Sequence, residues 1–165
     1  MANLDFFKTC FKNEMGATVS LFNSFQNEAI THKTHPVNRS VGEIMEHILC
    51  HLIDLDIILK QYVCDEALTF DVVSPTVAAG NLERLWLEVN LTLEQISLEK
   101  WEKESVELLL NGEHFVTLPR MNMMWFFFFD IIHHRGQLST YVRPTGSKVP
   151  AIYGFSADSI TLTGS

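Results

Sequence analysis

Charge is sparse in this 165-residue chain, and positive charge is the scarcer kind. Charged residues make up 19% of the sequence, and 12 Lys and Arg stand against 20 Asp and Glu, for a net charge of −8 with neutral histidine. Binding to nucleic acid or to an anionic membrane surface depends on Lys and Arg. The composition therefore argues against a nucleic acid or a membrane as the partner.

Several sequence signals are also missing. The cysteines, Cys10, Cys50 and Cys64, are odd in number and form no C-x-x-C pair, which favours a reduced, cytoplasmic protein. The most apolar stretch, residues 123–129, is followed at once by Asp130 and is far shorter than the ~20 residues of a membrane-spanning helix. The N-terminus has no basic start and no apolar core of a signal peptide. G-x-S-x-G, H-E-x-x-H and glycine-rich phosphate loops are absent, which argues against those classes of enzyme.

Apolar residues are abundant, at 47% of the chain with 12 Phe, and this predicts one well-packed domain over residues 1–165. Apolar side chains recur at helical spacing in four stretches, at about residues 4–28, 41–63, 82–97 and 120–143. Ser40 and Glu43 form a capping box at the start of the second stretch. The sequence therefore predicts an all-α helical bundle.

A β-hairpin is predicted between the third and fourth helices. Two apolar runs, residues 106–110 and 114–118, flank Asn111-Gly112, and Asn-Gly is the strongest short hairpin turn signal. Pro119 ends the second strand and is suited to the first turn of the last helix.

The last helix carries the residues that point to chemistry. Asp130 and His134 are four residues apart and so share a face, with Gln137 next on that stripe. On the second helix His47, His51 and Asp54 form another polar stripe. Imidazole and carboxylate groups on facing helices can hold a divalent metal. The donors suit Zn, Ni, Fe or Mn.

Residues 125–129, WFFFF, are apolar all round and precede Asp130 directly. We expect this segment to be buried on most sides, in the core or in a dimer contact, and to keep the metal pocket dry.

The C-terminal part of the chain resembles the signature of the DinB/YfiT-like family. The matching residues are 133–139, Tyr141, Arg143, Gly146, 148–150, 152–154 and 156–158. Residues 40–43 with His47 are similar to the family's motif on the second helix, so the resemblance covers nearly the whole chain.

The resemblance implies an up-down-down-up four-helix bundle, often a homodimer, with a metal triad of one His from the second helix and an H-x-x-x-H pair from the last. By position the triad is His47, Asp130 and His134, with Asp in place of the first His of the pair. His133 and His51 are the secondary candidates. The implied ion is one divalent metal, Zn or Ni first, with Fe or Mn as alternatives.

The resemblance also implies an activity, the metal-dependent transfer of a low-molecular-weight thiol to an electrophile in stress or detoxification. A small thiol or another small anionic molecule is then the expected substrate, with Arg135, Gln137 and Arg143 as candidate substrate-binding residues. Two alternatives stay open: a non-catalytic dimeric bundle stapled by a metal, and a metal-dependent hydrolase that uses bound water.

Overall fold

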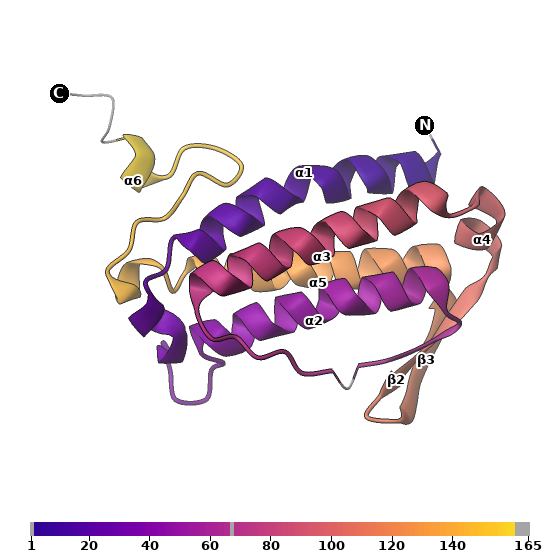
Figure 1. The fold of residues 1–165 in the computed structure, drawn as a ribbon, viewed down its shortest axis with the longest axis horizontal. Coiled ribbons are helices and arrows are strands. Elements are labelled where there is room, and N and C mark those ends of the chain that lie inside the picture. The colour runs from indigo at the N-terminus through magenta and orange to yellow at the C-terminus, as the bar shows by residue number, and fades with distance from the viewer. Residues whose placement is uncertain (1, 67, 161–165) are drawn as a thin grey trace.

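The computed structural model describes residues 2–66 and 68–160, and most of them are helical. The long helices are α1 (Asn3–Asn23), α2 (Val41–Lys60), α3 (Pro75–Gln95) and α5 (Arg120–Ser139). The shorter helical segments are η1 (Asn27–Thr31), α4 (Leu98–Lys103), η2 (Arg143–Thr145) and α6 (Ala157–Ile160). The long helices lie side by side, and the chain runs through α1 and α5 in one direction and through α2 and α3 in the other (Figure 1).

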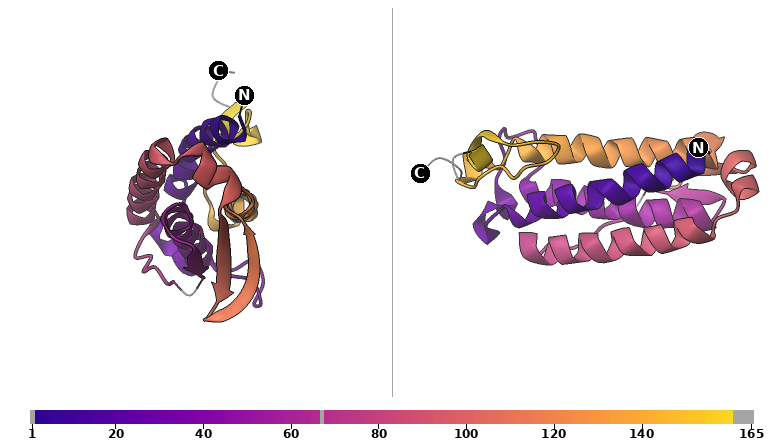
Figure 2. Two further views of the ribbon diagram at one scale, coloured as in Figure 1. Left: turned by 90° about the vertical axis from the view of Figure 1, so that its right-hand side faces the viewer. Right: turned by 90° about the horizontal axis from the view of Figure 1, so that it is seen from above.

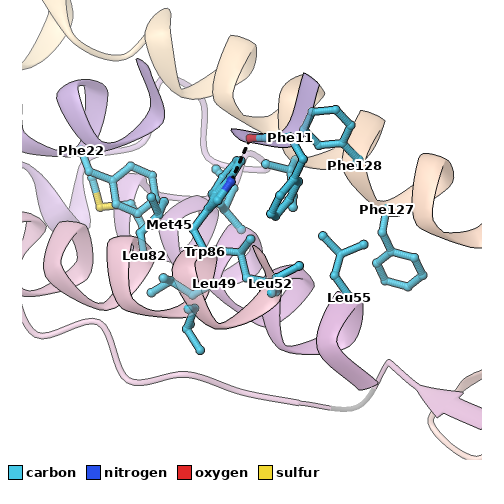
Figure 3. Packing of buried hydrophobic residues seen from close by; sticks show 14 of the residues in the cluster. Phe11, Phe22, Met45, Leu49, Leu52, Leu55, Leu82, Trp86, Phe127 and Phe128 are labelled. Atoms are coloured by element: carbon cyan, nitrogen blue, oxygen red, sulfur yellow. Dashed lines mark hydrogen bonds between the residues drawn. The ribbon is translucent and has the colours of Figure 1, made fainter. Parts of the chain in front are cut away.

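The apolar core lies between these helices, because each of them turns a buried stripe inward. Helix α2 packs against α3 and α5, and α1 packs against the same two helices. Phe11, Trp86 and Phe128 are at the centre, where the Trp86 indole stacks on the Phe11 ring with the centroids 4.5 Å apart. The buried indole N–H donates to the Phe11 carbonyl at 2.9 Å, so its polar atom is satisfied (Figure 3).

A small three-stranded sheet lies at one end of the helices, and the irregular C-terminal segment lies at the other (Figures 1 and 2). Strands β2 (Ser105–Leu110) and β3 (Glu113–Pro119) pair antiparallel. Asn111 and Gly112 both have positive φ, 53° and 81°, as a two-residue hairpin turn requires. The hairpin prediction is confirmed. Strand β1 (Val63–Asp65), parallel to β2, was not predicted.

Three predicted helix boundaries are wrong. Helix α1 ends at Asn23 and not near residue 28, because the Ser24 hydroxyl bonds back to the Leu21 carbonyl at 2.7 Å. Helix α3 begins at Pro75 and not near residue 82, because the Ser74 side chain caps the Val77 amide at 3.2 Å. Helix α5 ends at Ser139, several residues before the predicted end near 143.

The predicted capping box of α2 is present. The Ser40 hydroxyl accepts from the Glu43 amide, and the Glu43 carboxylate accepts from the Ser40 amide.

The expectation that residues 125–129 are buried on most sides is wrong. Phe127 and Phe128 are buried, but Phe126 and Phe129 are 48% and 61% exposed. Helix α5 packs on α1 and α2 through one stripe only, so the residues between the buried positions face outward. Within the described ranges no helix is long and apolar enough to cross a membrane.

Two glycines give opposite predictions for stability. A Cβ on Gly42 meets Ile30 Cγ1 at 2.9 Å and the Ile30 carbonyl oxygen at 3.1 Å, whereas one on Gly80, inside α3, meets nothing within 4 Å. We expect Gly42→Ala to destabilise the protein by about 1–3 kcal/mol through overpacking. Gly80→Ala gains up to about 1 kcal/mol of helix propensity. Urea unfolding measures both changes, and a loss of stability in Gly80→Ala would contradict its place inside a helix.

Candidate metal centre

The polar stripe of α2 faces the polar stripe of α5. His47, His51 and Asp54 lie on successive turns of α2, and Asp130 and His134 lie one turn apart on α5. The two helices pack directly against each other. The close packing of their apolar stripes therefore holds these groups at a helix–helix interface.

The carboxylate of Asp130 is the focus of the cluster, because three histidines turn their Nε2 atoms toward the same oxygen, Oδ2. The distances from Asp130 Oδ2 are 2.7 Å to His51, 3.2 Å to His134 and 3.5 Å to His47. The imidazole rings of His47 and His134 meet edge to face, with centroids 4.5 Å apart. Imidazole nitrogens from two helices thus converge on one carboxylate.

The cluster is partly open to solvent. His51 is buried, whereas the Asp130 side chain is 36% exposed. The expectation of a dry pocket is wrong, because the outward-facing Phe126 and Phe129 do not cover Asp130. A solvent path leaves room for a small molecule to approach the cluster.

The protonation states of the cluster suit a cation. Burial lowers the pKa of His47, and the hydrogen bond to Asp130 offsets this only in part, so His47 is neutral at pH 7. Burial also lowers the pKa of His51, but its contacts with Asp130 and Asp54 outweigh it and raise the pKa to about 9. Burial alone would raise the pKa of Asp130, yet its hydrogen bonds with the histidines hold that pKa well below its usual range. Asp130 is therefore an anion at every physiological pH.

Two of the histidine rings are oriented from behind. His134 Nδ1 donates to Gln137 Oε1 at 3.0 Å, which leaves its Nε2 lone pair directed at the cluster. His51 Nδ1 lies 3.4 Å from the Asp54 carboxylate, which is fully buried and also accepts from the Cys64 thiol. Such outer contacts fix the tautomer of a ligating histidine and its ring orientation.

His47, Asp130 and His134 fit a divalent metal. One ligand atom from each lies within 4.8 Å of the others. Tetrahedral ligands at about 2.1 Å from an ion are ~3.4 Å apart, and the distances of 3.2 and 3.5 Å from Asp130 are close to that value. The 2.7 Å contact of His51 is a hydrogen-bond distance, so this ring supports the Asp130 carboxylate.

A second set of ligand atoms overlaps the first. His47, His51 and Glu66 also bring one ligand atom each within 4.8 Å of one another. The pKa of Glu66 is raised, chiefly by burial. Sequence reasoning missed Glu66, because it reaches the cluster only through the pairing of β1 with β2, and no helical spacing signals that pairing.

The remaining candidate residues lie around or away from the cluster. His133 is exposed and belongs to neither ligand set found among the described residues. Arg135 is buried against α1, where it pairs with Glu14 and lies over the Tyr153 ring. Gln137 contacts His134, as described above. Arg143 is in η2 and pairs with Asp158 at 3.1 Å. The substrate-binding roles of Arg135, Gln137 and Arg143 stay predictions.

The fold and the site together define a mostly helical protein with a His/Asp metal-binding group at the junction of two helices. The chain belongs to the DinB family, whose family model matches residues 3–161. The resemblance noted in the sequence is confirmed.

Two crystal structures of DinB-like proteins share the fold. One, from Bacillus subtilis, is 18% identical with a TM-score of 0.69, over 90% of this chain and 99% of the other. The other, from Bacillus cereus, is 17% identical with a TM-score of 0.69, over 89% of this chain and 95% of the other. A search of curated protein sequences found no match.

The contact between Gln137 and His134 predicts a change in metal affinity. Gln137→Leu removes the acceptor for His134 Nδ1 and should weaken binding of Zn²⁺ by about 10–100-fold. Gln137→Glu keeps an acceptor and should retain the affinity. Competition with a chromophoric chelator at fixed pH measures both, and equal affinity of Gln137→Leu and the unaltered protein would contradict this role.

Proposed function

We propose that this protein is a metal-dependent enzyme that transfers a low-molecular-weight thiol to a small electrophile in stress or detoxification. The observation that carries the proposal is the convergence of His47, Asp130 and His134, whose ligand atoms lie within 4.8 Å of one another beside solvent. The proposal takes the long helices to form the up-down-down-up bundle of the family, and takes the cytoplasm, where thiols stay reduced, as the setting.

His47, Asp130 and His134 would hold the ion, Zn or Ni first and Fe or Mn as alternatives. Three protein ligands leave a coordination position open, and a divalent ion there promotes deprotonation of a thiol to the nucleophilic thiolate. The chain's own residues do the rest. Asp130 supplies negative charge, Gln137 directs the His134 ring, and the Asp54–His51 pair steadies the Asp130 carboxylate.

The activity test begins with the metal content of protein purified without a chelator. We expect close to one divalent ion per chain and metal-dependent conjugation of a small thiol to 1-chloro-2,4-dinitrobenzene. His47→Ala removes a ligand and should lower both the metal content and the rate to those of the metal-free control. Less than about 0.2 ion per chain, with no uptake on addition, would contradict the site, because three intact ligands bind divalent ions.

A second function is favoured by the position of the ligands, because His47 is on α2 while Asp130 and His134 are on α5. A bound ion then staples the two helices whether or not the protein is an enzyme. If the ion raises the melting temperature, His134→Ala abolishes that rise and no thiol reacts above the metal-free rate, the staple is the better description. A metal-dependent rate of ester or amide hydrolysis without thiol would instead favour the hydrolase.

We also propose that the protein is a homodimer that buries the aromatic surface of α1 and α5. Phe6 and Phe129 are 51% and 61% exposed, and Trp125 contacts both rings at centroid distances of 5.9 and 5.3 Å. Contiguous apolar surface of this kind is typical of protein contacts. Phe129→Asp should shift the mass in light scattering from dimer to monomer. Phe155→Asp, exposed but outside this aromatic group, is the control, and a monomeric unaltered protein would contradict the dimer.

A further inference from the structure

A cavity of about 260 Å³ opens beside the metal centre. Its lining is Arg39, Glu43, Glu46, His47, Cys50 and Leu68. At ~30 Å³ per water molecule the volume equals about nine waters, the size of an amino acid and not of a peptide. Because His47 belongs both to this lining and to the metal-binding group, a small molecule in the cavity lies against the centre.

Arg39 supplies the permanent positive charge of the cavity. Its guanidinium makes no hydrogen bond or ion pair with any residue in the described ranges, whereas Arg135 and Arg143 are both paired. Its backbone carbonyl accepts from the Tyr141 hydroxyl at 3.1 Å, which ties the residue to the end of the last helix. Arg39 is therefore anchored through its backbone while its charged end stays available for an anion.

The acidic side chains of the lining are already partly engaged. Glu43 accepts from the Ser40 amide and pairs with Lys33 at 2.9 Å. Glu46 accepts from the Phe70 amide at 3.1 Å. Neither carboxylate pairs with Arg39, so the guanidinium is not neutralised from within the cavity.

The thiol of the cavity itself does not provide the nucleophile. Cys50 Sγ donates to the Leu68 carbonyl at 3.5 Å, and burial, followed by the negative charge of Asp54, raises its pKa to about 11. The thiol therefore stays protonated at neutral pH and is held by the segment that lines the cavity. A sulfur nucleophile that reaches the centre has to come from a bound molecule.

We propose that this cavity selects a small thiol that carries a carboxylate, with Arg39 holding the carboxylate while the sulfur faces the metal centre at His47. The inference rests on the proposed function and adds a substrate class and a specificity-determining residue to it. Guanidinium and carboxylate form paired, charge-assisted hydrogen bonds, which a neutral thiol of the same size cannot make.

The test compares two thiols of similar size, 3-mercaptopropionate and 2-mercaptoethanol, on protein loaded with Co²⁺. The charge-transfer absorption between sulfur and cobalt reports thiol binding without any turnover. We expect the unaltered protein to bind 3-mercaptopropionate more tightly, and Arg39→Ala to reduce that preference by about 10–100-fold, the usual worth of a hydrogen bond to a charged group. Arg39→Lys should keep part of the preference, since it keeps the charge but loses the paired geometry.

Arg84→Ala on α3 is the matched control, because it removes an exposed Arg outside the cavity lining and should leave the preference unchanged. Co²⁺ content, measured first, separates the two ideas. Protein that takes up no Co²⁺ contradicts the proposed function and with it this inference. Protein that binds Co²⁺ and both thiols, with the same preference in Arg39→Ala as in the unaltered chain, overturns the role of Arg39 alone.

Discussion

The arrangement of the site depends on one carboxylate oxygen. Asp130 Oδ2 lies within 3.5 Å of three imidazole nitrogens, two of them from α2 and one from its own helix. A carboxylate at a helix–helix interface is costly unless it is paired, and here the pairing also sets how α2 and α5 face each other at this level. The rings of His47, His51 and His134 take their directions from this shared acceptor, and Gln137 and Asp54 complete them from behind.

The presence of Asp in place of the family's usual His changes what the surroundings have to supply. An imidazole ligand donates its other N–H outward, whereas a carboxylate needs donors of its own. His51 meets that need at 2.7 Å and is held by the buried Asp54. The Asp54–His51–Asp130 chain is thus a support for a carboxylate ligand, built from residues that would have no such role around a third histidine.

Much of this could be predicted from the sequence, and the successes are local. The capping box of Ser40 and Glu43 and the Asn111-Gly112 hairpin turn depend on contacts between residues a few positions apart. The shared face of Asp130 and His134 follows from helical spacing alone, and the facing stripe on α2 from the expectation that the helices pack. The boundaries of α1 and α3 were missed, because each depends on a single serine side chain whose hydrogen bond outweighs the apolar pattern.

Other parts of the site depend on long-range structure. Glu66 joins the histidines because β1 pairs with β2, more than forty residues away along the chain. Arg39 lies just before a helix in a connecting segment, and only the three-dimensional structure shows that it lines a cavity beside His47. The exposure of Phe126 and Phe129 likewise follows from which face of α5 meets its neighbours, which an unbroken apolar run does not reveal.

The connection between α2 and α3 returns along α2 as an extended strap (Figure 1) and brings Leu68 and Phe70 against Cys50 and Glu46. The metal-binding residues are on helices, whereas much of the cavity wall comes from this strap and from the segment before α2. Connecting segments tolerate insertions and substitutions far better than packed helices do. Metal binding and ligand preference are thus encoded on separate stretches of the chain, so that one can diverge in evolution while the other is preserved.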